Sequence, residues 1–213
     1  LLSVESFLFL LFFLPILPLG AQAPCNYLLE LFDSQGDGWD NAVLTITVDG
    51  EARTFTLNPA TGSGAFRAFE VPVGDGDELR VSYTGGLANQ QNSYALYDSE
   101  GQLLFSDGPL PESGTVLVTQ ASCPSCPAPS SRLISIDDVR DDRADISFVP
   151  PDPSASYILE YGLASFPQGT GQEIDAGDGM VRISGLEERT TYDFYVFGVC
   201  TGGDTSVIQG PFT

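Results

Sequence analysis

Short runs in which apolar and polar residues alternate follow one another along most of the chain, separated by turns rich in glycine and proline. Tyr27, Leu29 and Leu31 alternate with their neighbours, and Leu44 and Ile46 do the same after an acidic loop. A period of two places successive side chains on opposite faces of a strand. No long segment keeps the 3.6-residue period of a helix. The pattern predicts an all-β protein.

The expected strands fall into two groups. The first group is predicted at residues 27–32, 42–48, 53–57, 65–71, 78–83, 93–97, 102–105 and 115–119. About eight strands in about 100 residues favour a jelly-roll-like or related β-sandwich. The second group is predicted at residues 132–136, 144–149, 157–161, 180–183, 192–200 and 206–212. The chain is therefore predicted to form two tandem β-sandwiches.

The first 23 residues, rich in Leu and Phe, are predicted to be a secretory signal peptide. An apolar stretch at residues 7–19 precedes a small-x-small cleavage site at residues 21–23. The stretch is shorter than the ~20 residues of a transmembrane helix, and Pro15 and Pro18 interrupt it. We expect cleavage after Ala23, with a retained N-terminal anchor as the alternative. The product is expected to be secreted or held at the cell surface, with no membrane span after cleavage.

The four cysteines are Cys25, Cys123, Cys126 and Cys200. An even number of cysteines after an export signal indicates disulfides. Of the three possible pairings, the one that respects domain boundaries joins Cys25 to Cys123 and Cys126 to Cys200. A redox-active pair at 123 and 126 is the alternative, but the flanking prolines place it in a rigid linker. The expected domains are residues 24–123 and 132–213, joined by a Pro-rich linker at 124–131.

The formal net charge is −21, from 29 acidic residues and eight basic ones, all of them Arg. Such a charge repels the phosphates of nucleic acids and excludes them as partners. An extracellular protein or a glycan is the expected partner instead. Because the chain has no His, a serine nucleophile lacks its usual base, and neither a G-x-S-x-G elbow nor a zinc motif is present. The sequence therefore predicts a protein that is not an enzyme.

The acidic loop between the first two strands carries the strongest chemical signal. Its candidate calcium ligands are Asp33, Gln35, Asp37, the carbonyl of Trp39, Asp40 and Asn41. Oxygen ligands at alternate positions of a tight loop, with Gly38 at the sharp turn, suit a hard cation such as Ca²⁺. Position 12 of a calcium loop is Leu44 here rather than a bidentate Glu, and no flanking helices are predicted.

The alternative interpretation of the same loop is a wide β-turn. In it, Asp33 and Asp37 cap backbone amides, Gly36 and Gly38 adopt positive φ, and Trp39 enters the sandwich core. Both interpretations remain open at the level of sequence, and a bound Ca²⁺ is expected to stabilise the fold rather than to act in catalysis.

A second polar cluster precedes the sixth strand. Its candidate ligand-binding residues are Asn89, Gln91, Asn92 and Tyr94. Amide groups beside an aromatic ring are a common combination for binding sugars, and exposed loops carry function more often than cores do. An ordinary connection between strands is the alternative.

The second group of strands resembles a known family. The segments concerned are Cys126-Pro-Ala-Pro, Ile146-Ser-Phe, Tyr157-Ile-Leu-Glu-Tyr-Gly, Ile183-Ser-Gly-Leu, Thr190-Thr-Tyr-Asp-Phe-Tyr-Val and Val199-Cys200. They resemble a fibronectin type III domain, in the cysteine-bearing version common in exported proteins of the Bacteroidetes. The resemblance implies a tyrosine corner at Tyr192. Phe148 stands where the family usually has a core Trp.

The first group of strands resembles another module of the same exported proteins, marked by a D-S-x-G-D-G-W loop. Together the two resemblances imply non-catalytic modules for adhesion, display or spacing within a larger exported protein. We therefore expect further sequence downstream. The alternative function is a carbohydrate-binding accessory region of an exported hydrolase or protease whose catalytic domain lies outside this chain.

Overall fold

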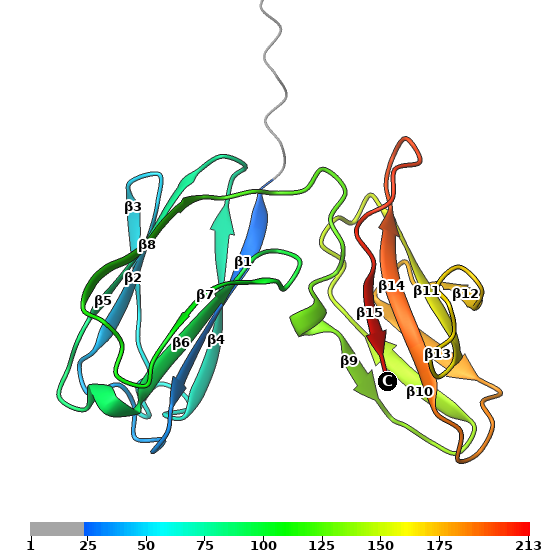
Figure 1. Cartoon of the computed structure of the whole chain (residues 1–213), viewed down its shortest axis with the longest axis horizontal. Coiled ribbons are helices and arrows are strands. Elements are labelled where there is room, and N and C mark those ends of the chain that lie inside the picture. Colours follow the sequence, from blue (N-terminus) through cyan, green and yellow to red (C-terminus); the bar gives the residue numbers. More distant parts are fainter. Residues whose placement is uncertain (1–23) are drawn as a thin grey trace, which may run out of the picture.

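The computed structural model describes residues 24–213, which form two β-sandwiches joined by a short connection (Figure 1). The predicted signal peptide, residues 1–23, lies outside the described residues. The helical elements of residues 24–213 are two 3₁₀ turns, η1 (Asn89–Gln91) and η2 (Ser131–Leu133). Within the described part of the chain, no helix is long and apolar enough to cross a membrane. The predicted all-β fold of two tandem β-sandwiches is confirmed.

Eight strands build the first sandwich. They are β1 (Cys25–Asp33), β2 (Val43–Val48), β3 (Glu51–Phe55), β4 (Phe66–Val73), β5 (Glu78–Thr84), β6 (Asn92–Tyr97), β7 (Leu103–Asp107) and β8 (Gly114–Gln120). One sheet has the order β4-β1-β6-β7 and the other the order β3-β2-β5-β8. A jelly roll pairs its first strand with its last, whereas β1 pairs with β4 and β6. The first domain is therefore a related sandwich rather than a strict jelly roll.

The core of the first sandwich follows from the alternation seen in the sequence. Leu29 and Leu31 of β1 face Leu44 and Ile46 of β2 across the core, and all four are at most 1% exposed. Strand β1 departs from simple alternation, because Leu28 and Glu30 on its outer face are also buried. Something outside the sheet must therefore cover that face.

Seven strands build the second sandwich. They are β9 (Ser135–Asp137), β10 (Arg143–Ser147), β11 (Ser156–Leu163), β12 (Gln172–Asp175), β13 (Met180–Ser184), β14 (Tyr192–Val199) and β15 (Gln209–Phe212). The sheets have the orders β13-β10-β9 and β12-β11-β14-β15. This three-plus-four arrangement is like that of a fibronectin type III domain. The sequence did not predict β12, because Ile174 is the only apolar residue of that strand and gives no alternating pattern. In the structure its other three residues are exposed.

Two aromatic residues occupy the positions expected from the family resemblance. The hydroxyl of Tyr192 accepts a hydrogen bond from the backbone N–H of Glu187 at 3.0 Å, which is the tyrosine corner. Phe148 is buried and makes an edge contact with Tyr157, with ring centroids 5.7 Å apart. An aromatic residue thus fills the place of the usual Trp.

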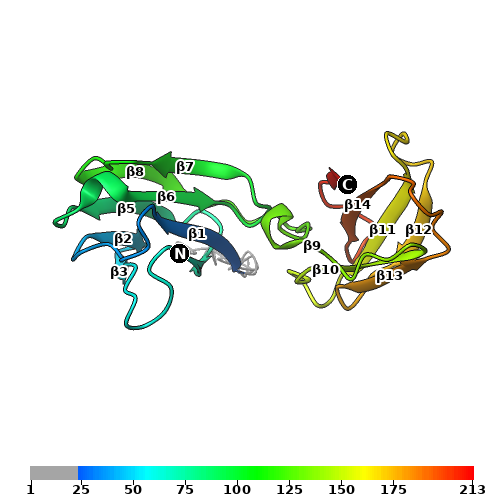
Figure 2. The same cartoon turned by 90° about the horizontal axis from the view of Figure 1, so that it is seen from below.

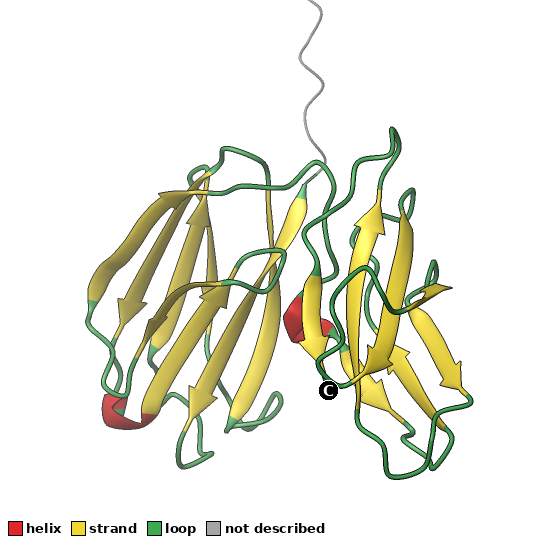
Figure 3. Ribbon diagram, turned by 45° about the vertical axis from the view of Figure 1, so that its right-hand side comes forward, coloured by secondary structure: helices red, strands yellow, loops and turns green. Residues whose placement is uncertain are grey.

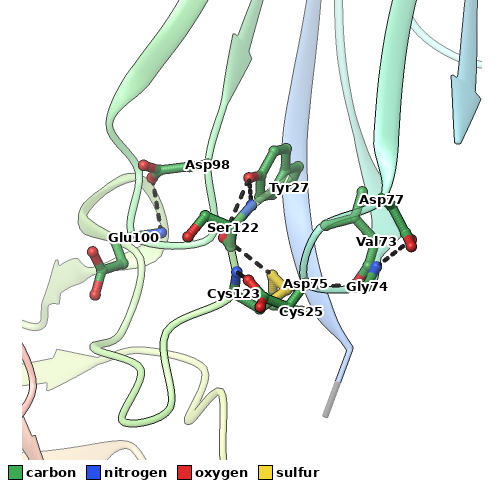
Figure 4. The surroundings of a disulfide bond; sticks show 10 residues. All are labelled: Cys25, Tyr27, Val73, Gly74, Asp75, Asp77, Asp98, Glu100, Ser122 and Cys123. Atoms are coloured by element: carbon green, nitrogen blue, oxygen red, sulfur yellow. Dashed lines mark hydrogen bonds between the residues drawn. A yellow bond between two sulfur atoms is a disulfide. The ribbon is translucent and has the colours of Figure 1, made fainter. Parts of the chain in front are cut away.

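Each sandwich contains one disulfide, and the two bridges follow the predicted pairing. Cys25 is bonded to Cys123, and Cys126 is bonded to Cys200. Figure 4 shows how side chains fix the end of the first sandwich around its bridge: the hydroxyl of Tyr27 accepts a hydrogen bond from the N–H of Ser122 at 2.8 Å. The first bridge ties the start of β1 to the segment after β8, and the second ties the segment before β9 to the end of β14. Such bridges stabilise a fold chiefly by restricting the unfolded chain.

Candidate functional site

The acidic loop connects β1 to β2 at one end of the first sandwich. Asp33 is the last residue of β1 and is 4% exposed. Its Oδ1 accepts hydrogen bonds from the backbone N–H groups of Gln35, at 2.9 Å, and Gly36. This is the cap described by the β-turn interpretation. Gly38 has φ of 97°, and a Cβ there would come within 2.9 Å of the Leu57 carbonyl, so only glycine fits.

Trp39 anchors the loop to the core. Its side chain is fully buried and its Nε1–H donates to the carbonyl of Phe32 at 2.9 Å. Tyr83 and Tyr94 make edge contacts with the Trp39 ring at centroid distances of 5.8 and 6.4 Å. The carbonyl of Trp39, a candidate ligand, already accepts a hydrogen bond from the N–H of Ala42 at 2.7 Å.

The other candidate ligands of the loop lie at the surface or at its edge. Gln35, Asp37 and Asn41 are exposed, and Asp40 is half-buried. The carboxylate of Asp37 caps no backbone amide here, and instead its Oδ1 accepts a hydrogen bond from Gln91 Nε2 at 3.2 Å. Within residues 24–213 no group of three or more His, Cys, Asp and Glu side chains converges as a metal cluster. Calcium binding by this loop stays a prediction.

The polar cluster before β6 does not form the exposed face that the sequence suggested. Gln91, Asn92 and Tyr94 are 5%, 0% and 1% exposed, and only Asn89 is half-buried. The expected exposure was wrong because Asn92 and Tyr94 lie on the inward face of β6. Burial raises the pKa of the Tyr94 hydroxyl, and the nearby Asp107 carboxylate raises it further. Glycan binding by these residues stays a prediction.

Side chains of this cluster instead organise the interior of the sandwich end. Asn92 Nδ2 donates to the hydroxyl of Tyr83 at 2.9 Å, and that hydroxyl donates to Asn89 Oδ1 at 3.0 Å. Asn89 Oδ1 also accepts from the N–H of Gly86 at 2.6 Å. The amides therefore tie the loop before β6 to strand β5.

The fold brings the acidic loop and the polar cluster together. Asp33 and Asn92 are directly paired across β1 and β6. Next to this pair, the N–H of Ser34 donates to the Gln91 carbonyl at 3.0 Å, and the Gln91 side chain reaches Asp37. Sequence reasoning treated the two clusters as separate sites, because the pairing of β1 with β6 is a long-range contact with no local signal.

Several oxygens at this end of the sandwich are buried without a hydrogen-bond partner. They are Asp33 Oδ2, Gln91 Oε1, Asn92 Oδ1 and the hydroxyl oxygen of Tyr94. Buried polar atoms normally have a partner, and a charged oxygen without one is especially costly.

A second polar site, missed by sequence reasoning, joins the two sandwiches. Arg132, in η2, donates from Nη2 to both carboxylate oxygens of Glu30, at 2.8 and 2.7 Å. The same guanidinium lies over the ring of Tyr97, with its Cζ 4.7 Å from the ring centroid. Figure 3 shows η2 in the space between the sandwiches. Together, the residues Glu30, Tyr97 and Arg132 are called the junction below.

The turn between β6 and β7 extends the junction. The carbonyl of Glu100 accepts hydrogen bonds from the N–H of Ser131 at 3.2 Å and from Gln209 Nε2 at 3.0 Å. A Cβ on Gly101 would collide with the hydroxyls of Ser130 and Ser131, so the backbones approach closely. Burial raises the pKa of the Glu100 carboxyl, with a smaller contribution of the same sign from Asp98. The connection, β15 and the first sandwich therefore meet at one turn.

The comparisons with known proteins return structural neighbours only. A two-domain fibronectin type III segment of chicken tenascin covers 89% of this chain and 93% of its own, with 14% identity and a TM-score of 0.34. A cytokine receptor complex covers 88% and 100%, with 13% identity and a TM-score of 0.35. No protein-family model and no curated protein matches the chain. The likeness of the second sandwich to a fibronectin type III fold rests on its own strand order.

Proposed function

We propose that the chain is a non-catalytic extracellular spacer and display segment of an exported protein, in which the junction holds two disulfide-bonded sandwiches at a fixed angle. The observation that carries the proposal is the ion pair in which Nη2 of Arg132 donates to both carboxylate oxygens of the buried Glu30. A planar guanidinium that is held by two hydrogen bonds and by a ring fixes orientation as well as distance. In a flexible linker, no such contact would hold the two domains in one orientation.

We also propose a location, a module type and a class of partner for this segment. Disulfides form and persist in oxidising surroundings, so the two bridges support an extracellular or cell-surface location. The first sandwich is proposed to be the D-S-x-G-D-G-W module of exported Bacteroidetes proteins, and the role of the pair is adhesion or display toward an extracellular protein. The burial of Tyr94 and Asn92 supports a protein rather than a glycan as the partner.

Small-angle X-ray scattering of the purified protein tests the spacer function. The scattering curve is expected to fit one fixed arrangement of the two sandwiches in the wild type and a spread of arrangements in Arg132→Ala. Arg140→Ala is the matched control, because Arg140 pairs with the exposed Asp138 in the connection between β9 and β10 and makes no ion pair with Glu30. A wild-type curve that requires many arrangements contradicts the proposed function.

A further inference from the structure

Only one of the two carboxylate oxygens of Asp33 is used by the turn that it caps. The cap on Gln35 and Gly36 engages Oδ1 alone, and Oδ2 is buried with no partner. A turn needs only one capping oxygen, so the cap does not explain why the second oxygen of a carboxylate is kept from water. Leaving a charged oxygen unsatisfied costs more than leaving a neutral one.

Gln91 presents a second unsatisfied oxygen to the same end of the sandwich. Its Nε2 is committed to Asp37 Oδ1, and its Oε1 is buried without a partner. The reverse orientation of the amide would set Oε1 against the Asp37 carboxylate, two acceptors with no proton between them. The contact with Asp37 therefore fixes which way the amide points.

These atoms come from neighbouring backbone positions. Asp33 is paired with Asn92, the residue that follows Gln91, and the backbone of Ser34 is hydrogen-bonded to the backbone of Gln91. This end of the sandwich therefore holds the carboxylates of Asp33 and Asp37 and the side-chain amide of Gln91. Among the described residues, no arginine forms an ion pair with either carboxylate.

We propose that this corner binds a hard divalent cation of the Ca²⁺ class through Asp33 Oδ2, Gln91 Oε1 and the carboxylate of Asp37. Carboxylate and amide oxygens are the ligands that Ca²⁺ takes, and water completes its coordination. This ligand set differs from the one expected from loop spacing, because Gln91 replaces Gln35 and the Trp39 carbonyl is engaged with Ala42. Two carboxylates place the site in the weak range of extracellular modules, with a dissociation constant of about 10⁻⁴ to 10⁻³ M.

Bound Ca²⁺ would join the β1–β2 loop to the start of β6. The cation would give Asp33 Oδ2 and Gln91 Oε1 the partner that they lack. It would also link two segments that are otherwise held together by backbone hydrogen bonds and by the Gln91–Asp37 contact. Binding to the folded state alone raises the thermal stability of the first sandwich. Trp39 is the only Trp of the chain and lies in the same loop, so its fluorescence reports the unfolding of this sandwich.

Thermal unfolding of the purified protein, followed by Trp39 fluorescence with and without about 10 mM Ca²⁺, tests the proposal. The melting temperature of the first sandwich in the wild type is expected to rise by about 6–20 °C. Asp33→Asn keeps the capping Oδ1 but replaces Oδ2 with an amide nitrogen, so the rise is expected to disappear. Asp37→Asn, at an exposed position, is expected to fold normally and to show a smaller rise.

The matched control is Asp98→Asn. Asp98 Oδ1 also caps two backbone N–H groups, those of Glu100 at 3.0 Å and Gln102 at 2.8 Å, in a turn of the same sandwich. This variant is expected to lose some stability and to keep the full response to Ca²⁺. A wild type that does not respond, a response that survives both Asp33→Asn and Asp37→Asn, or an equal response to NaCl of matched ionic strength overturns the site.

Discussion

Arg132 closes over the buried carboxylate of Glu30, so a residue of the second half of the chain completes the outer face of β1 in the first sandwich. Glu30 is 6% exposed and Leu28 beside it is also 6% exposed, although both point away from the core of the first sandwich. The view in Figure 2 shows the segment that carries Arg132 between the two sandwiches. The docking of the two sandwiches therefore accounts for the burial of a strand face that would otherwise be solvated.

The pair between Glu30 and Arg132 is expected to contribute about 2 kcal/mol to docking, within the range for hydrogen bonds to charged groups. The contribution stays below that of a fully buried ion pair, because the Arg132 side chain is 42% exposed. A double-mutant cycle with Glu30→Gln, Arg132→Gln and the double variant, measured by urea denaturation, gives the coupling energy. A coupling energy near zero would show that the contact does not hold the sandwiches together.

Trp39→Phe is expected to destabilise the first sandwich by about 2–3 kcal/mol. The smaller ring leaves a void beside Tyr83 and removes the donor that satisfies the Phe32 carbonyl. Circular dichroism during chemical denaturation measures the change, since the variant has no Trp fluorescence. The control is Phe66→Leu, at a side chain that is 44% exposed, which is expected to change stability by less than about 0.5 kcal/mol. Equal effects of the two substitutions would contradict the placement of Trp39 in the core.

Replacing Cys126 and Cys200 with serine is expected to destabilise the second sandwich by about 2–4 kcal/mol. The transition seen by Trp39 fluorescence should stay nearly unchanged, because the bridge that closes the first sandwich is intact. The matched variant, with Cys25 and Cys123 replaced, should move the fluorescence transition instead. If both variants shift the Trp39 transition equally, the two sandwiches unfold as one unit rather than separately.

Glu100→Gln is expected to strengthen docking at neutral pH. Burial raises the pKa of Glu100 in the folded state, so the folded protein binds the proton more tightly than the unfolded chain does. The favourable contribution of the protonated form is complete below the ordinary Glu pKa of about 4.3 and is lost as the pH rises through the folded-state pKa.

The gain from Glu100→Gln should therefore be present at pH 7 and absent at about pH 4. Melting temperatures of wild type and variant across this range give the measurement. Glu51→Gln, at an exposed position of β3, removes the same charge and should show no such pH dependence. A gain that is independent of pH would contradict the burial of the Glu100 carboxyl at the junction.

The strands were predictable from sequence where one face is buried and the other solvated. Leu44 and Ile46 alternate with Thr45 and Thr47, and their strand lies where the pattern placed it. Strand β12 escaped prediction because it has a single apolar side chain, Ile174, and is held by its pairing with β11. The hydrogen bonds between paired strands join backbone groups, so they do not require any particular pattern of side chains.

The candidate sites were harder to predict because they depend on which strands become neighbours. Spacing within the acidic loop suggested Gln35 as a ligand, whereas the fold places Gln91 against Asp37. Tyr94 looked like an exposed ring beside amides, but its position on the inward face of β6 buries it. The contact of Glu30 with Arg132 spans 102 positions in sequence, and no local motif marks either residue.

Residual dipolar couplings of the backbone amides in both sandwiches test the fixed junction most directly. In the wild type, the couplings of residues 24–123 and of residues 132–213 are expected to fit a single alignment tensor, with the sandwiches oriented as the Glu30–Arg132 pair requires. In Arg132→Ala, the two sets are expected to need different tensors. Two independent tensors in the wild type would show that the sandwiches move separately, and would contradict the proposal of a fixed spacer.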